Sequence, residues 1–154
     1  MISFDDQGQI KALIAKLKQT KGELLENRDV IEQMAVMGKN IIYLRTLQGK
    51  DVNGSDFPAY TPGYSGAHGK TTVNLVDTGT MLNAMTQKVL NNTTAMIYFL
   101  NITERNGELV QNIAKWHNTG AGKQPQREFF GLNDFDFKEI AKKYQEHVKK
   151  ILAK

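Results

Sequence analysis

The sequence predicts an α+β protein with helices at both ends and a small, mainly antiparallel sheet between them. Apolar residues recur at helical spacing near both ends of the chain. Between them, two short runs rich in apolar and β-branched residues meet at an Asn-Asn pair, which is typical of a hairpin. The 154 residues are 40% hydrophobic and 23% charged, which indicates one globular domain over residues 1–154.

The N-terminal part, residues 1–48, is expected to be helical. Ile10, Leu13, Ile14 and Leu17 have helical spacing, and Gly22 is expected to interrupt this first helix. A second helix is expected over roughly residues 27–47. Its apolar face is broad, which predicts packing on more than one side.

Residues 49–70 are expected to form a long loop, because glycine and proline recur throughout. Loops of this length are usually functional or disordered, and we expect mobility over residues 65–70. Asp51–Asp56 resembles the start of a calcium loop. Asp56 and Pro62, however, stand where an EF-hand needs glycine and an acid, so an Asx-rich turn is favoured over a cation contact.

Residues 71–132 are expected to hold the sheet and short helices. Strands are predicted over 71–76, 87–90, 93–100 and 126–130, the middle two joined by Asn91-Asn92. A short helix carrying Met81, Leu82 and Met85 is expected to be capped by Asp77 or Thr78. A further helix containing Leu109 and Trp116 is expected to end at Gly120.

The last segment, residues 133–154, gives the clearest helix prediction. Asn133, Asp134 and Asp136 supply capping or acidic residues at its start. Its apolar stripe comprises Phe137, Ile140, Ala141, Tyr144, Val148, Ile151 and Leu152. Residues 138–154 also account for the whole net charge of +4. The lysines there can face solvent, which is the favoured interpretation, or an acidic partner or nucleic acid.

The residue pattern offers no catalytic, cofactor or metal site. Cysteine is absent, and no two of the three histidines have metal-ligand spacing. Two segments resemble phosphate-binding loops. The glycine spacing of Gly63–Thr71 is wrong for such a loop, and Thr119–Gln124 lacks the early glycine and has Gln124 where a hydroxyl residue is required. For His117, a core or turn histidine bonded to backbone is favoured over a catalytic base. No apolar run approaches the roughly 20 residues of a membrane span.

Three segments together resemble a phage family. They are Gly49–Tyr60, Val73–Met85 and Trp116–Leu132. Their order and spacing, followed by a C-terminal helix, are similar to those of the virion-morphogenesis and tail-completion proteins of tailed bacteriophages, including Mu-like phages and prophages. The resemblance spans about residues 28–150. Trp116 departs from it, because an aliphatic residue or tyrosine is common there.

The resemblance implies a structural protein of the head–tail joining region, without enzymatic activity or cofactor. Such proteins complete the tail and form a ring around the DNA channel, for which a hexamer is expected. The implied partners are further copies, other neck and tail proteins, and genome DNA in non-specific contact. The implied locations are the neck or tail of the virion and the bacterial host cytoplasm during assembly. The alternative is a small basic nucleic-acid-binding protein that acts through the C-terminal helix.

The resemblance also nominates site residues. The candidate assembly or motif residues are Asp51, Gly54, Phe57, Tyr60, Asp77, Thr78, Gly79, Met81, Leu82, His117, Asn118, Gly120, Pro125, Arg127, Phe129 and Gly131. The candidate basic residues of a DNA channel are Lys123, Lys142, Lys143, Lys149 and Lys150. Met81, Leu82 and Met85 form either plain core or a pliable apolar face. Arg127 is expected to pair with an acid, either within the subunit or across a ring contact.

Overall fold

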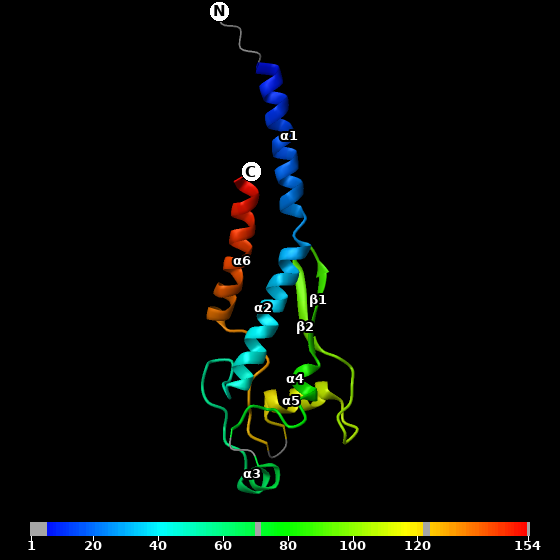
Figure 1. The fold of residues 1–154 in the computed structure, drawn as a ribbon, viewed down its shortest axis with the longest axis vertical. Coiled ribbons are helices and arrows are strands. Elements are labelled where there is room, and N and C mark those ends of the chain that lie inside the picture. The colour runs from blue at the N-terminus through cyan, green and yellow to red at the C-terminus, as the bar shows by residue number, and fades with distance from the viewer. Residues whose placement is uncertain (1–5, 70–71, 122–123, 154) are drawn as a thin grey trace, which may run out of the picture.

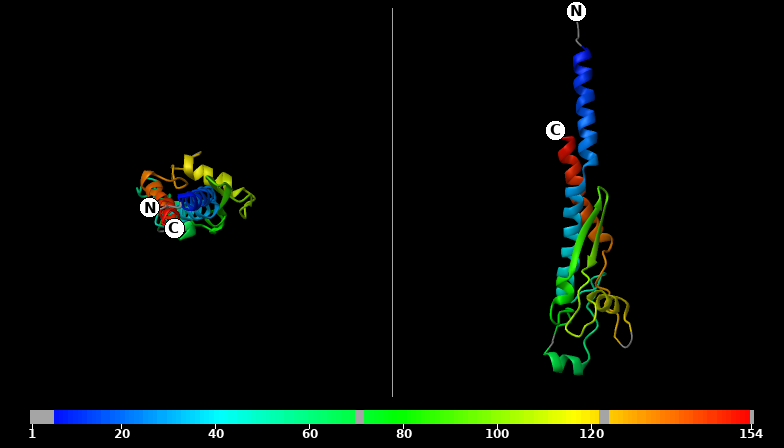
Figure 2. Two further views of the ribbon diagram at one scale, coloured as in Figure 1. Left: turned by 90° about the horizontal axis from the view of Figure 1, so that it is seen from above. Right: turned by 90° about the vertical axis from the view of Figure 1, so that its right-hand side faces the viewer.

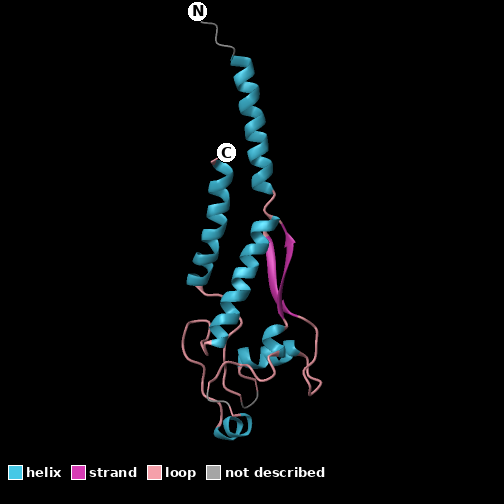
Figure 3. Ribbon diagram, viewed as in Figure 1, coloured by secondary structure: helices cyan, strands magenta, loops and turns pink. Residues whose placement is uncertain are grey.

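A computed structural model of the protein describes residues 6–69, 72–121 and 124–153. The molecule is elongated, and its long helices run along the long axis (Figure 1). The helices are α1 (Asp6–Leu25), α2 (Arg28–Leu47), α3 (Pro62–His68), α4 (Thr80–Asn83), α5 (Val110–Thr119) and α6 (Asp134–Leu152). The strands β1 (Met85–Asn91) and β2 (Thr94–Phe99) form an antiparallel pair (Figure 3). This architecture confirms the α+β prediction.

The break between the first two helices lies at Asn27 and not at Gly22. Helix α1 continues through Gly22, whose carbonyl accepts a hydrogen bond from the Glu26 amide at 3.1 Å. A glycine inside a helix costs about 1 kcal/mol in propensity but keeps the backbone hydrogen bonds. The buried Asn27 ends the helix, because its Nδ2 donates to the Leu24 carbonyl at 2.6 Å.

Helix α2 is the central element of the body. It lies between α6 and the hairpin (Figure 1), so the prediction that it packs on more than one side is confirmed. The close approach depends on Gly38. A Cβ atom at this position would lie 3.1 Å from Ile97 Cδ1 and 3.4 Å from Ile140 Cδ1, that is, against β2 and α6 together.

The predicted hairpin is confirmed. Met85, expected on the short helix, instead begins β1, because α4 ends at Asn83. Met85 pairs with Phe99 and Val89 with Ala95, and the register shifts between Val89 and Asn91. The Asn91 side chain stabilises the turn, because its Oδ1 accepts a hydrogen bond from the Thr93 amide at 2.9 Å. The core lies against the Met85 end of the hairpin and contains Ile42, Phe57, Leu75, Met81, Leu82, Met85, Ala114 and Phe129.

The strands predicted over 71–76 and 126–130 are wrong. Thr71 lies outside the described residues, and residues 72–76 are irregular, with Leu75 at φ 56°. In the second segment, the Arg127 amide donates to the His117 carbonyl and the Phe130 amide to Asn118 Oδ1. These backbone groups therefore bond to separate partners instead of forming the ladder that a strand requires.

The loop predicted over 49–70 contains a helix and contributes to the core. Helix α3 begins after Thr61, whose Oγ1 accepts a hydrogen bond from the Tyr64 amide at 3.4 Å, and has proline in its first turn. Val52 and Phe57 are buried. The Asx turn is confirmed, because Asp51 Oδ1 accepts from the Asn53 and Ser55 amides at 2.9 and 2.8 Å. The mobility expected over residues 65–70 stays a prediction, and Lys70 lies outside the described residues.

Helix α6 confirms the C-terminal prediction and its cap. Asn133 Oδ1 accepts from the Asp136 amide at 2.9 Å, and Asp136 Oδ2 accepts from the Asn133 amide at 3.0 Å. Ile140 and Ile151 are buried as the stripe predicts, but Phe137 is 57% exposed and Leu152 is 63% exposed. The apolar stripe is therefore wider than the surface that the neighbouring helices cover.

We expect Ile140→Ala to destabilise the protein by about 2–5 kcal/mol, because it leaves a cavity between α6 and Gly38 of α2. Urea unfolding followed by circular dichroism measures this. Phe137→Ala is the matched control on the same helix and should change the free energy of unfolding by no more than about 0.5 kcal/mol. Equal effects of the two substitutions would contradict the assignment of faces on α6.

Candidate functional site

An open cleft of about 890 Å³ is lined by α3, α5 and the segments near them. These elements lie at the end of the molecule away from the N-terminus (Figure 1). The walls of the cleft are α3, the turn before α4, residues 104–106, α5 and residues 124–127. Figure 2 shows that α5 and its neighbouring loops project to one side of the long axis. The cleft is therefore formed by the irregular half of the protein, beyond the hairpin.

The cleft brings together residues from all three segments that carry the phage resemblance. The candidate residues that line it are Tyr60 from the first segment, Asp77, Thr78, Gly79 and Met81 from the second, and His117, Pro125 and Arg127 from the third. These positions are far apart in the sequence. Their convergence is the reason for treating this cleft as the candidate site.

Arg127 lies in the cleft wall with 4% of its surface exposed. Its Nε donates to the Pro58 carbonyl at 3.0 Å, and its Nη2 donates to the Ala59 carbonyl at 3.1 Å. The guanidinium carbon lies 5.0 Å from the centre of the Tyr60 ring, within cation–π range. Burial lowers the pKa of Arg127, against the opposing effect of the two nearby tyrosines.

The acid expected to pair with Arg127 within the subunit is not there: among the residues with described positions, no carboxylate forms an ion pair with it. The expectation was wrong because the backbone of residues 58–59 passes beside the guanidinium and supplies carbonyls instead. The pairing across a ring contact stays a prediction.

An aromatic wall, which sequence reasoning missed, stands beside Arg127. The Tyr60 and Tyr64 ring centres lie 4.8 Å apart, and Tyr64 stacks on His68 at 4.3 Å. Tyr64 and His68 are four residues apart on α3, so they share one face of the helix. The signal that could have revealed this helix is Thr61-Pro62, an N-cap residue followed by proline at the first helical position.

The opposite wall is the turn before α4. Gly79 is the N-cap residue, with φ 84°, and no side chain caps the helix, so the expected cap by Asp77 or Thr78 is wrong. The Thr78 hydroxyl instead accepts from the Thr80 amide at 3.2 Å and donates to Glu104 Oε1 at 2.8 Å. Asp77 Oδ1 lies 3.6 Å from His68 Nδ1, so this turn contacts α3.

The backbone carbonyl of His117 forms a hydrogen bond, whereas its ring nitrogen Nδ1 does not. Its carbonyl accepts from the Arg127 amide at 2.7 Å, as the prediction of a turn histidine requires. Its ring Nδ1, however, is buried and has no partner among the described residues. Burial, aided by the positive charge of Arg127, lowers the pKa of His117 to about 4. The ring is therefore neutral at pH 7.

The remaining motif residues support the cleft structurally. Phe57, Leu82 and Phe129 are buried in the core, together with Met81 and Met85, so plain core is the correct interpretation of that apolar face. Gly120 ends α5 at φ 70°, and a Cβ there would lie 2.8 Å from the Gln126 amide nitrogen. Gly54 has φ 85° in the Asp51 turn, and the Gly131 carbonyl accepts a hydrogen bond from Arg45. Asn118 acts through its side chain, whose Oδ1 accepts from the Phe130 amide.

The candidate DNA-channel lysines do not gather at the cleft. Lys142 pairs with Glu139 at 2.5 Å, and Lys143 shares a shallow hollow with Asp29 and Glu32. Lys149 and Lys150 are exposed in the last turn of α6, where positive charges interact favourably with the helix dipole. Lys123 lies outside the described residues.

Comparison with family models, curated proteins and solved structures found no match to this chain.

Over residues 6–69, 72–121 and 124–153, no group of three or more His, Asp or Glu side chains could hold a metal ion. None of the helices in this part of the chain has the length and hydropathy needed to cross a membrane. In the segment Gly63–Thr71, which resembles a phosphate-binding loop, residues 63–68 belong to α3 and do not form a loop.

We expect the free energy of unfolding to fall as the pH is lowered from 7 to 5, because the unfolded chain protonates His117 near pH 6.5 whereas the folded protein does so only near pH 4. The loss from this group amounts to at most about 2 kcal/mol. Urea midpoints at pH 7, 6 and 5 measure it. His117→Gln should flatten the pH dependence, and the exposed control His68→Gln should retain it. An unchanged slope in His117→Gln would contradict the buried neutral ring.

Proposed function

We propose that this protein is a structural assembly protein of the head–tail joining region of a tailed phage. It completes the tail by forming a ring of copies, for which a hexamer is the expectation, and it acts without catalysis or cofactor. The observation that carries the proposal is the convergence of the three phage-like segments on one open cleft. A well-formed pocket on which a few polar groups converge is the default hypothesis for a binding site.

Helix α1 supports assembly independently. It extends beyond the rest of the molecule (Figure 1), and its side chains Leu13, Ile14 and Leu17 are 57%, 46% and 59% exposed. A lone helix of this length is marginally stable in water, because most helical stability in proteins comes from tertiary packing. Contact with further copies or with neck and tail proteins would bury these side chains.

This proposal places the protein in the virion neck or tail, and in the host cytoplasm while virions are assembled. A ring of identical copies needs a heterologous interface, in which one patch meets a different patch on the next copy. The cleft is one candidate patch. The proposed DNA channel adds only a weak, sequence-independent contact with the genome.

The nucleic-acid-binding alternative receives less support. Lys142 and Lys143, two of the five lysines on α6, lie beside carboxylates of the same chain. Acids that neutralise a basic surface weaken its attraction for phosphate.

We expect the purified protein, or the protein in assembled particles, to form a closed ring. Sedimentation and native mass measurement give the stoichiometry, and electron microscopy of the protein with isolated tails shows its position. The isolated chain can stay monomeric until it meets a tail, because ordering of loops costs free energy that a partner offsets. A monomer both in solution and in particles would refute the proposal.

We expect Lys142, Lys143, Lys149 and Lys150, changed together to Gln, to leave the melting temperature and the assembly state unchanged. Retention on DNA should weaken only at low salt, because such contacts are electrostatic and fade steeply as salt rises. The matched control changes Lys11, Lys16, Lys18 and Lys21 of α1 to Gln, which removes the same charge elsewhere. Micromolar DNA binding at physiological salt that only the α6 variant loses would favour the nucleic-acid-binding alternative.

A further inference from the structure

The cleft contains a buried cation that lacks an anion. Two of the three guanidinium nitrogens of Arg127 donate to carbonyls, and Nη1 has no hydrogen bond within the described residues. A buried charge without a counterion is costly, and a carboxylate placed beside an arginine forms strong charge-assisted hydrogen bonds. The two acids that line the cleft face other groups, since Asp77 lies beside His68 and Glu104 accepts from Thr78. The cleft is therefore suited to a carboxylate from outside.

The walls around Arg127 also favour an aromatic group next to that carboxylate. Tyr60 and Tyr64 line the cleft, and so does Trp116 of α5, which is 38% exposed. Aromatic rings gain both buried area and favourable ring–ring geometry when they pack together. The occupant with the matching chemistry is a protein segment that carries an acid and an exposed aromatic side chain side by side.

This chain presents such a segment at the start of α6. Phe135 is 69% exposed, more than any other large hydrophobic residue in the described part of the chain. Its neighbour Asp134 is exposed, and its carboxylate makes no hydrogen bond or ion pair with the described residues. The capping box of Asn133 and Asp136 holds both residues in a helical turn. Such preorganisation reduces the entropy lost on docking.

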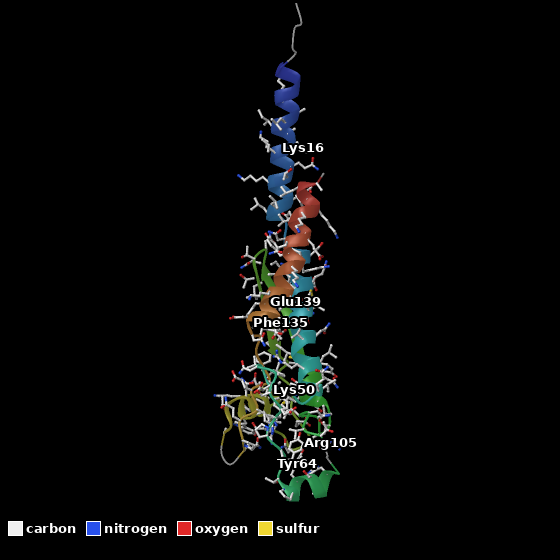
Figure 4. All side chains as sticks on the ribbon, turned by 90° about the vertical axis from the view of Figure 1, so that its left-hand side faces the viewer. Lys16, Lys50, Tyr64, Arg105, Phe135 and Glu139 are labelled. Carbon is white, nitrogen blue, oxygen red and sulfur yellow. The ribbon has the colours of Figure 1, made fainter. Side chains whose placement is uncertain are left out.

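The two surfaces lie on different parts of the molecule. Figure 4 shows Phe135 beside the middle of the body, whereas Tyr64 lies at the α3 end. The segment is therefore placed to reach the cleft of a second copy and not its own. We propose that the Asp134–Phe135 pair of one copy docks in the Arg127 cleft of the next, with the Asp134 carboxylate on the guanidinium and the Phe135 ring between Tyr64 and Trp116.

This proposal rests on the proposed self-association and names its interface. The contact is heterologous, so after the first docking one copy keeps a free cleft and the other keeps a free Asp134–Phe135 pair. Repetition of the contact closes a ring if the rotation between copies allows it, and otherwise builds an open chain.

The absence of cysteine allows a direct test by disulfide trapping in the full-length protein. Phe135→Cys and Trp116→Cys chains are mixed and oxidised, in solution and in assembled particles, and the products are separated by mass. We expect covalent dimers from the mixture and a ladder of larger species from the chain that carries both substitutions. Phe137→Cys is the matched control, because it is exposed on another face of the same helix turn, and it should give at least tenfold less cross-linking with Trp116→Cys.

A second measurement uses no cross-link. Asp134→Lys with Phe135→Ser removes the docking pair, and Arg105→Glu with Trp116→Ala alters exposed cleft residues. Each variant should fold, as judged by circular dichroism, and should fail to assemble alone. An equimolar mixture should stop at dimers, because only one intact contact can form.

The outcomes separate this inference from the function proposed above. The proposed interface would be wrong if either variant assembled like the wild type, or if Phe135→Cys and Phe137→Cys cross-linked equally. The proposed ring would not be affected by these outcomes. If Trp116→Cys in assembled particles cross-linked to a different neck protein, the cleft would not be occupied by a second copy of this chain. A wild-type chain that is monomeric everywhere would overturn both proposals.

Discussion

The ion pair between Arg45 and Asp136 is the constraint on which the rest of the structure depends. Arg45 Nη1 lies 2.5 Å from Asp136 Oδ2, and both side chains are about nine-tenths buried. Arg45 Nη2 also donates to the Gly131 carbonyl, and Asp136 closes the capping box of α6. The pair thus joins the end of α2, the start of α6 and the chain that precedes α6. Removal of one partner would leave a buried charge, which typically costs about 3–5 kcal/mol.

The same network places both surfaces of the proposed interface. Asn133 Nδ2 donates to the Val52 carbonyl at 2.7 Å, and the Val52 amide donates to the Glu128 carbonyl at 2.8 Å. These bonds attach the loop after α2 to the segment that enters α6. Arg127 directly precedes this attachment and Phe135 directly follows it. The cleft and the proposed docking pair are therefore positioned by one hydrogen-bonded junction, although they lie on different parts of the surface.

The two buried arginines show how similar environments lead to different roles. Arg45 has a carboxylate partner, so its charge is compensated within the subunit and it stabilises the fold. Arg127 has two carbonyls and the face of Tyr60, which satisfy donors but carry no net negative charge. Its burial therefore leaves free energy to be gained from an external anion. The two arginines therefore differ in whether the fold supplies a counterion.

The sequence by itself determined the features that depend on neighbours a few residues away. The helical stripe of α6, the capping box of Asn133 and Asp136, the hairpin turn at Asn91 and the Asx turn at Asp51 all rest on contacts within four residues. Only the tertiary structure decided the rest. Residues 72–76 and 126–130 have strand-like composition but no partner strand, and the exposure of Phe137 depends on how much of α6 its neighbours cover. The counterion of Arg127 likewise depended on residues 58–59, which lie nearly 70 positions away in the chain. Ladders, buried faces and charge pairs need distant groups, and no local pattern specifies which distant groups will meet.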